Sequence, residues 1–288
     1  MLAIAVLLAV VVGISLGLLG GGGSILTLPI LRYVLGMEAH QAVAVSLLVV
    51  GTTSAFAMIP HALKGRVRWR TGALFGAAGM VGAYGAGRIA TLLPSGLLLG
   101  LFGAMMLVTA GAMMRGRKIA PDMSAVVRDL PVAKVLAEGL VVGTVTGLVG
   151  AGGGFLVVPA LVLLGGLPMD IAVGTSLVVI AMKSFAGFAG YLSSTPIDST
   201  VASLVTAAAV LGSFAGGALA GRISPDRLRE GFAWFVVAMA FFILGQELPR
   251  ALGFPVSILT ALLGTVVGTS LVAIIAASAR RLSAPARG

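Results

Sequence analysis

The stretch SLGLLGGGGSILTLPIL, Ser15 to Leu31, places four consecutive glycines inside an otherwise apolar run. Residues 1–31 contain no Asp, Glu, Lys or Arg, and a bilayer core about 30 Å thick needs about 20 apolar helical residues to cross it. A helix that breaks inside the membrane must have its irregular backbone buried in protein or lining a wet cavity. The stretch therefore predicts a broken membrane helix.

The composition of the whole chain agrees with a membrane location. Of its 288 residues, 59% are hydrophobic and 10% are charged, and the mean hydropathy is +1.13, whereas a soluble domain carries about 25% charged residues. The net charge of +10 lies mostly in short loops between apolar spans, which is the pattern of membrane orientation and not of nucleic-acid binding. We expect an all-α, polytopic membrane protein in a lipid bilayer, with no nucleic-acid partner.

The sequence offers no metal or cofactor site. It contains no cysteine, which excludes disulfides and thiolate metal ligands. The N-terminal run lacks the positive n-region of a signal peptide, so we interpret it as the first membrane segment.

A second glycine-rich stretch, GLVGAGGGFLVVPAL, follows at an offset of 130 residues. Without a gap, residues 17–61 match residues 147–191 at 15 of 45 positions. The matches include Gly20/Gly150, Gly22/Gly152, Gly23/Gly153, Pro29/Pro159, Gly36/Gly166, Ser46/Ser176 and Ser54/Ser184. Apolar composition does not readily produce ordered glycine and proline matches. We therefore expect one repeat over residues 1–130, a second over 131–250, and a final transmembrane helix with a basic cytoplasmic tail over 251–288.

The apolar spans predict the order of the helices. They lie near residues 2–19, 24–36, 41–60, 71–93, 96–114, 134–149, 154–166, 169–192, 200–221, 228–248 and 253–278, with Pro94, Pro131, Pro168, Pro196, Pro225, Pro249 and Pro255 at boundaries or first turns. The basic loops at 61–70 and 115–131 predict a cytoplasmic side, and the loop at 193–199, which has no Lys or Arg, an external one.

The cytoplasmic and external assignments of these loops are consistent with one another only if each glycine-broken helix pair enters the membrane and returns to the same side. A single helix of about 31 residues would also be about 46 Å long, which exceeds the bilayer core. The two repeats are then inverted relative to each other, with an external N-terminus. Whether each broken pair crosses fully or is re-entrant stays open.

The glycine breaks are candidate binding sites because a new helix is expected to begin after each of them. A helix beginning at Ser24 or Gly154 presents unpaired N–H groups and the positive end of its dipole, which attract anions. Paired broken helices in inverted repeats indicate a transporter's substrate site. The candidate substrate-binding residues in the two runs are Gly20, Gly21, Gly22, Gly23, Ser24, Gly150, Gly152, Gly153 and Gly154. The alternative is that glycines permit close helix packing, which fits scattered glycines such as Gly79 and Gly212 better.

Lys183 lies near the middle of a predicted span, where a charge is costly and usually functional. All nine acidic residues fall at or near segment ends, so a substrate anion is its candidate partner. The alternative is a lysine that reaches toward the membrane interface. Ser46 and Ser176 are candidate hydroxyl donors to the same substrate, although hydrogen bonds between helices explain them too.

The two glycine motifs, each followed by a serine-containing helix (AVAVSLLVV and AVGTSLVVI), resemble those of the TauE/SafE family of sulfite and organosulfonate exporters. The resemblance covers about residues 2–278. It implies a multi-pass permease of the cell (inner) membrane that moves small anions, sulfite, sulfonates and sulfoacetate being substrates within the family. It also implies that Gly20 to Ser24 and Gly150 to Gly154 face the substrate. Lys183 is inferred from the residues alone.

We therefore expect a secondary transporter, and not an enzyme, working by alternating access as one repeat rocks against the other. A proton or sodium gradient, or the gradient of the substrate itself, would drive it. An anion channel is the nearest rival. An intramembrane serine hydrolase using Ser24 with His61 is the enzyme-class rival, although these residues pair with Gly154 and Tyr191 in the repeat. Substrate, direction of transport, coupling ion and oligomeric state stay open.

Overall fold

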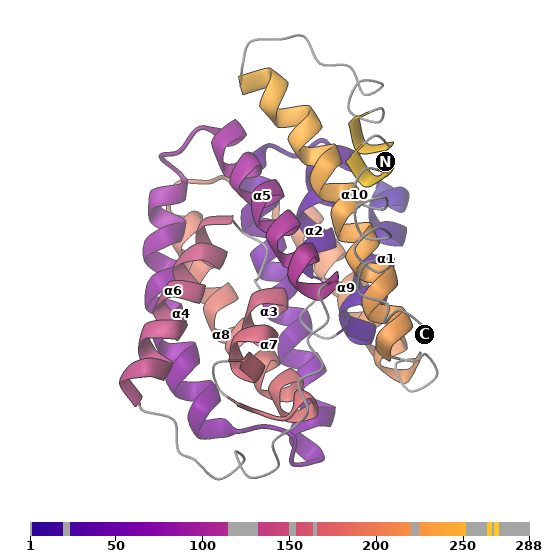
Figure 1. The fold of residues 1–288 in the computed structure, drawn as a ribbon. Coiled ribbons are helices and arrows are strands. Elements are labelled where there is room, and N and C mark those ends of the chain that lie inside the picture. The colour runs from indigo at the N-terminus through magenta and orange to yellow at the C-terminus, as the bar shows by residue number, and fades with distance from the viewer. Residues whose placement is uncertain are drawn as a thin grey trace, which may run out of the picture.

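The computed structural model describes residues 2–19, 24–114, 132–149, 154–163, 166–219, 225–251, 264–266 and 268–270. Within these residues all regular structure is helical (Figure 1). The elements are α1 (Leu2–Leu19), α2 (Thr27–Pro29), the π-helix η2 (Ile30–Val34), α3 (Ala39–Leu63), α4 (Trp69–Ala90), α5 (Ser95–Met114), α6 (Val132–Val149), α7 (Gly154–Leu163), α8 (Met169–Leu192), α9 (Ser199–Leu219) and α10 (Pro225–Ala251). The all-α class is confirmed for the described residues.

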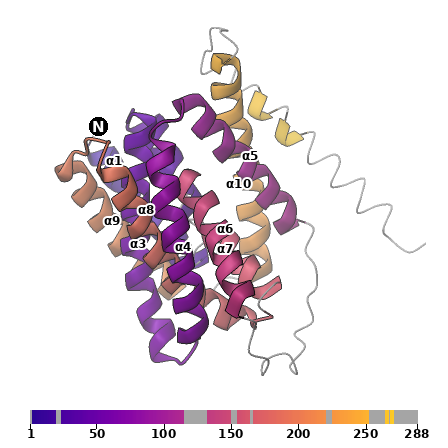
Figure 2. The same ribbon diagram turned by 90° about the vertical axis from the view of Figure 1, so that its left-hand side faces the viewer.

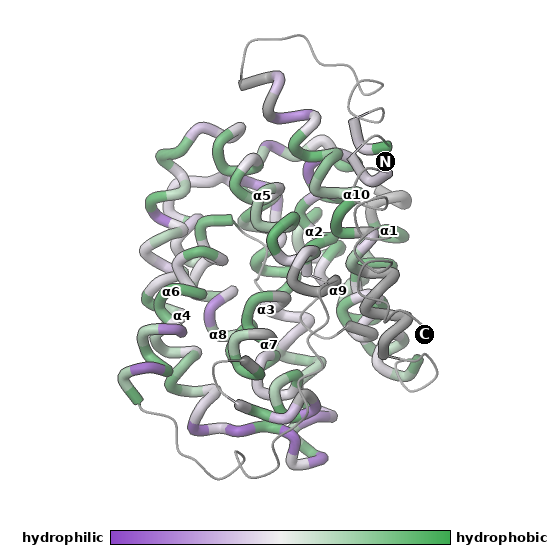
Figure 3. The backbone as a smooth tube through the Cα atoms, in the orientation of Figure 1, coloured by the Kyte–Doolittle hydropathy of each residue, from purple (hydrophilic) through white to green (hydrophobic). Residues whose placement is uncertain are grey.

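Four described helices are long and apolar enough to cross a membrane. They are Ala39–Leu63, Val132–Val149, Asp170–Leu192 and Ser199–Leu219. Hydrophilic stretches gather toward the two ends of the bundle, where loops join the helices (Figure 3). This distribution suits a bundle whose middle lies in hydrocarbon.

Most helix bounds follow the sequence prediction, and the departures occur at prolines. The spans 2–19 and 169–192 agree with α1 and α8, whereas the span 24–36 is a 3₁₀ turn at residues 24–26 followed by α2 and the π-helix. Pro29, which has no N–H, lies where the α-helix gives way to the π-helix. The prediction that Pro249 marks a boundary is wrong, because α10 runs through it to Ala251. Pro249 removes one i→i−4 backbone bond, and only two residues of α10 follow it.

The turn between the short and the long helix is the same in both halves. Gly36 and Gly166 have φ angles of +68° and +59°, a left-handed conformation that glycine adopts without steric cost. In both turns, the residue after the glycine donates its amide to a leucine carbonyl six residues earlier, at 3.1 Å. The matched glycines therefore form matched turns.

Glycines bring the backbones of two helix pairs into contact. α1 packs along α9, and α6 packs along α4 (Figures 1 and 2). The contacts recur with every residue displaced by 130 positions: Gly13 with Ala209 and Gly143 with Gly79, Gly17 with Ser213 and Gly147 with Ala83, Gly212 with Val10 and Gly82 with Leu140. Close packing is thus the role of these scattered glycines, since a Cβ at any of them would meet backbone atoms.

Two further pairs run antiparallel, α3 against α8 and α5 against α10. Rising residue numbers on one helix meet falling numbers on the other: Leu47 with Gly187 and Gly51 with Ser184, then Gly96 with Glu247 and Gly103 with Ala240. Figure 2 shows α5 and α10 on the side of the bundle away from α1 and α9. Between the two glycine-packed pairs, α3 contacts α1 and α9, and α8 contacts α4 and α6.

Candidate functional site

The two glycine runs lie only partly within the described part of the chain. Gly20, Gly21, Gly22, Gly23, Gly150, Gly152 and Gly153 are outside the described residues. Ser24 opens the 3₁₀ turn that leads into α2, and Gly154 is the first residue of α7. Both are buried. Residues 24 and 154 are therefore both enclosed by protein, and the glycines that precede them lie outside the described residues.

Lys183 ends inside the protein and not at its surface. Its side chain is 1% exposed, and its Nζ donates to Thr146 Oγ1 at 2.8 Å. Thr146 in turn donates to Val142 O of its own helix at 2.7 Å, so its oxygen accepts from the ammonium. The lysine stem packs over Gly79. Lys183 thus lies where α4, α6 and α8 meet.

No carboxylate of the described residues pairs with Lys183. The ion pairs found there join exposed or half-buried groups at helix ends: His40 with Glu38, Arg66 with Asp170 and Lys134 with Glu138. Burying a charge without an opposite charge is costly. Lys183 Nζ therefore has a single neutral partner, and an anion beside it would favour its protonated form.

Several buried hydroxyls near the middle of the bundle have no hydrogen-bond partner among the described residues. They belong to Ser46, Ser54, Ser184 and Thr27. In helices such hydroxyls commonly bond a carbonyl one turn earlier, as Ser176 does with Val173 O at 2.8 Å. Of the two predicted serine donors, Ser46 is therefore available, whereas the hydroxyl hydrogen of Ser176 is engaged within its helix.

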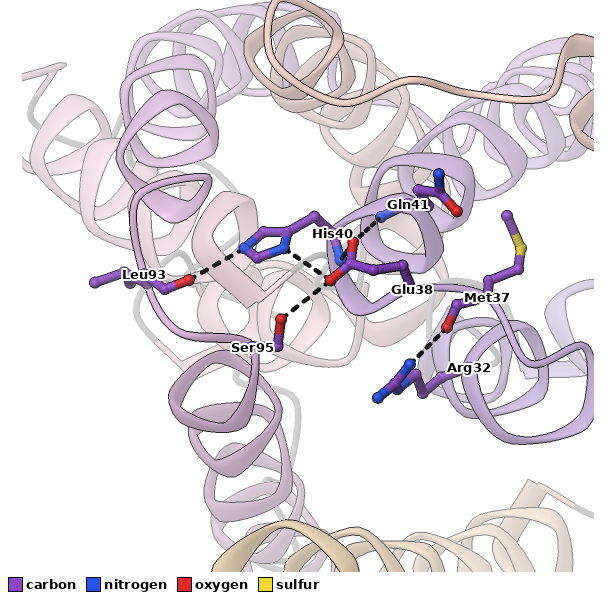
Figure 4. Close-up of polar contacts among 7 residues, drawn as sticks. All are labelled: Arg32, Met37, Glu38, His40, Gln41, Leu93 and Ser95. Atoms are coloured by element: carbon purple, nitrogen blue, oxygen red, sulfur yellow. Dashed lines mark hydrogen bonds and ion pairs between the residues drawn. The ribbon is translucent and has the colours of Figure 1, made fainter. Parts of the chain in front are cut away.

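A polar cluster closes the start of α3 (Figure 4). The Glu38 carboxylate accepts from the His40 amide at 2.9 Å and from Ser95 Oγ at 3.0 Å. Burial raises the pKa of Glu38, but the hydrogen bonds from His40 and Ser95 outweigh it, so the pKa lies below its ordinary value of 4.5. The ring Nε2 of His40 lies 3.2 Å from Leu93 O. The cluster ties α3 to α5.

A buried acid that sequence reasoning left at a segment end belongs to the interior. Glu247 is 4% exposed and accepts from Tyr33 OH at 3.1 Å. The Tyr33 ring stands edge-on to Phe242 with ring centres 5.2 Å apart. Glu247 joins α10 to η2 and does not pair with Lys183. The sequence does not indicate this burial, because Pro249 predicts a helix end directly after Glu247.

The structure keeps the two residues of the hydrolase hypothesis at different levels of the bundle. Thr27, three residues after Ser24, borders the same small cavity as Val49. His61 lies at the last turn of α3, beside Gly174. His61 comes twelve residues after Val49 on α3, a rise of roughly 18 Å along the helix. This arrangement gives no support to a Ser24–His61 pair.

The helical fold, its apolar spans and the lysine buried between them define an α-helical membrane protein. The chain belongs to the family described as sulfite exporter TauE/SafE, whose sequence profile matches residues 5–243. The resemblance seen in the glycine motifs is thereby confirmed.

Relatives of known name agree with this assignment. The chain is 35% identical over 240 residues to a "Probable membrane transporter protein" of Xylella fastidiosa, covering 82% of this chain and 92% of the relative. It is 26% identical to one of Methanocaldococcus jannaschii, covering 82% and 94%, and 28% identical to one of Bacillus subtilis, covering 85% and 96%. No solved structure matches it. The protein is therefore a membrane transporter.

Proposed function

We propose that this transporter is a secondary carrier of small anions, sulfite or organosulfonates, that works by alternating access in the cell (inner) membrane. The observation behind the proposal is the Lys183 ammonium. It is 1% exposed and has the neutral Thr146 hydroxyl as its partner, with no carboxylate among the described residues. A charge kept inside a membrane protein usually marks a substrate or ion path.

The repeat supplies an internal comparison for this lysine. At the offset of 130 residues its equivalent is Thr53, which is fully buried and donates to Val49 O of its own helix at 2.7 Å. The other half therefore packs around the same position without a charge. This difference favours a functional role for Lys183 over a packing role.

Other buried donors of the bundle would also suit a small oxyanion if the transport cycle brings them to it. Sulfite and sulfonates carry three oxygens that accept hydrogen bonds, and charge-assisted bonds to such oxygens are the strong ones. The unpartnered hydroxyls of Ser46, Ser54 and Ser184 can donate. The helix starts at Ser24 and Gly154 add the positive ends of two dipoles.

We further propose that the two halves are inverted repeats. The contacts between α1 and α9 recur between α6 and α4 with every residue displaced by 130 positions. The helices that correspond to each other, α3 with α8 and α5 with α10, run antiparallel where they touch. Copies of one unit that point in opposite directions across a membrane would pack in this way.

The contacts between helices also bear on which groups of helices would move relative to each other during alternating access. The first helix of each half packs on the third long helix of the other half, α1 on α9 and α6 on α4. A half defined by sequence is therefore not a compact body. We propose that the bundle of α1, α3 and α9 rocks against the bundle of α4, α6 and α8, in place of repeat against repeat.

Counterflow in proteoliposomes tests the carrier. Labelled sulfite and ethanesulfonate would be followed in the wild type, in Lys183→Met, and in Lys134→Met, which removes a half-exposed lysine from α6. We expect saturable uptake that substrate on the opposite side accelerates, unchanged in Lys134→Met and at least tenfold slower in Lys183→Met. Wild-type uptake by Lys183→Met would contradict the proposal.

The same vesicles separate the rival mechanisms. Flux that neither saturates nor responds to substrate on the opposite side would favour the channel. Imposed proton and sodium gradients would each be applied alone, and the gradient that drives accumulation identifies the coupling ion.

A further inference from the structure

A cavity of about 480 Å³ lies between the π-helix η2 and α10. Its described polar lining is Arg32, Tyr33 and Gln246, and its apolar lining is Pro29, Ile30, Val34, Met239 and Phe242. This volume, with mostly apolar walls and a few polar groups, is typical of a small-molecule site. It is separate from Lys183, which lies among α4, α6 and α8.

Arg32 gives the cavity a positive charge. Its Nη1 donates to Met37 O at 2.8 Å (Figure 4). Its Nε is enclosed and has no hydrogen-bond partner in the described part of the chain, where no carboxylate pairs with the side chain either. Glu247 is not one of the lining residues, and Tyr33 OH donates to it at 3.1 Å. The guanidinium therefore keeps hydrogen-bonding capacity for a ligand.

The π-helix accounts for the placement of these groups. An i→i+5 turn inserts extra backbone into a helix, and such insertions are frequent at functional sites. Here the π segment Ile30–Val34 contains both Arg32 and Tyr33. The buried amide of Gln246 faces them from α10, where Phe242 lies one turn earlier.

We propose that this cavity is a second anion site, and that its ligand is an organic oxyanion: a sulfonate or carboxylate on a short apolar body. The planar guanidinium suits two oxygens of one such group, and Phe242 and Met239 suit the apolar body. Sulfite has no carbon and would leave most of the volume unfilled. The choice of anion class rests on the proposed function, whereas the location does not.

Two sources carry the same chemistry, a soluble sulfonate and the headgroup of an anionic phospholipid. Calorimetry on the full-length protein in phosphatidylcholine nanodiscs, with butanesulfonate and sulfite as probes, would measure binding. The background is Lys183→Met, which removes the charge of the first site. Arg32→Gln is compared with Arg88→Gln, a matched control that removes an exposed arginine near the end of α4.

On this background we expect butanesulfonate to bind once and more tightly than sulfite. Arg32→Gln should weaken that binding at least tenfold, and Arg88→Gln should leave it unchanged. Arg32→Lys, which keeps the charge but not the fork, should fall in between, and Gln246→Leu should weaken binding if Arg32→Gln fails to fold. Equal binding in Arg32→Gln and Arg88→Gln, or none in the Lys183→Met background, would overturn the second site.

The remaining arms distinguish the sources and the two proposals. If phosphatidylglycerol in the nanodisc weakens butanesulfonate binding only while Arg32 is present, a lipid headgroup occupies the site. Unchanged binding identifies the soluble anion. A third outcome is possible: the wild type binds sulfite, Lys183→Met abolishes that binding, and Arg32→Gln changes no binding. The proposed function would then stand, and only the second site would be refuted.

Discussion

Replacing Lys183 by methionine should move substrate binding and folding stability in opposite directions. Methionine keeps an unbranched stem against Gly79 but removes the ammonium and its bond to Thr146. A hydrogen bond that involves a charged group contributes about 1.5–3 kcal/mol. At about 1.4 kcal/mol per tenfold change in affinity, loss of that bond to the substrate weakens binding about 10- to 150-fold.

Stability follows a different rule, because the folded protein without substrate gains nothing from an isolated buried charge. Exchanging buried charges for apolar groups is often neutral or stabilising by about 1–4 kcal/mol. Thr146 keeps its bond to Val142 O at 2.7 Å, so no partner is left unsatisfied. We expect an unchanged or higher free energy of unfolding for Lys183→Met.

The assay pairs calorimetric binding of sulfite and ethanesulfonate with denaturant unfolding in the same detergent. Lys134→Met is the control, because it removes a lysine that is 50% exposed and should alter neither quantity. A variant that unfolds more easily and binds as the wild type does would refute the reasoning. Lys183 would then be a structural residue.

Three more perturbations test the packing, the capping cluster and the topology. Gly143→Ala places a Cβ against the α4 backbone and should destabilise by about 1–3 kcal/mol in denaturant unfolding, whereas Gly85→Ala, with open space around it, should be neutral or stabilise by up to about 1 kcal/mol. The pKa of Glu38 is lowered below 4.5 in the folded state, so the ionised carboxylate contributes its full stabilisation above pH 4.5 and loses it as the pH falls through the folded-state pKa. The unfolding midpoints of wild type and Glu38→Gln should therefore converge in acid. A gap between them that stays constant with pH would contradict this sign. Because the chain has no cysteine, Lys64→Cys and Ser194→Cys can be labelled singly, and an impermeant maleimide added outside cells should react with position 194 and not with position 64.

The sequence was informative wherever one segment decides the outcome. The bounds of α1 and α8 follow from apolar runs and prolines, and the burial of Lys183 follows from its place near the middle of a long apolar helix. The repeat was visible because the glycine and proline matches keep one offset. Each of these signals lies within a single stretch, or within two stretches that align without gaps.

The sequence was silent where two distant segments make the feature. Thr146 accepts from Lys183 across 37 positions, and nothing in VTGLV distinguishes that threonine from others. The sequence position of Arg32 does not single it out, because most interfacial arginines also lie near a segment end. The π-helix Ile30–Val34 that contains it has no composition signal of its own.

The contact between Gly13 and Ala209 has a consequence for synthesis. The partner of α1 is made 209 − 13 = 196 residues later, which at about 5–20 residues per second means roughly 10–40 s of translation. During that interval the glycine-lined face of α1 has only lipid or the insertion machinery beside it. Neither half is thus a self-contained folding unit, and a gene split between the halves should yield active protein only when both fragments are produced in the same cell.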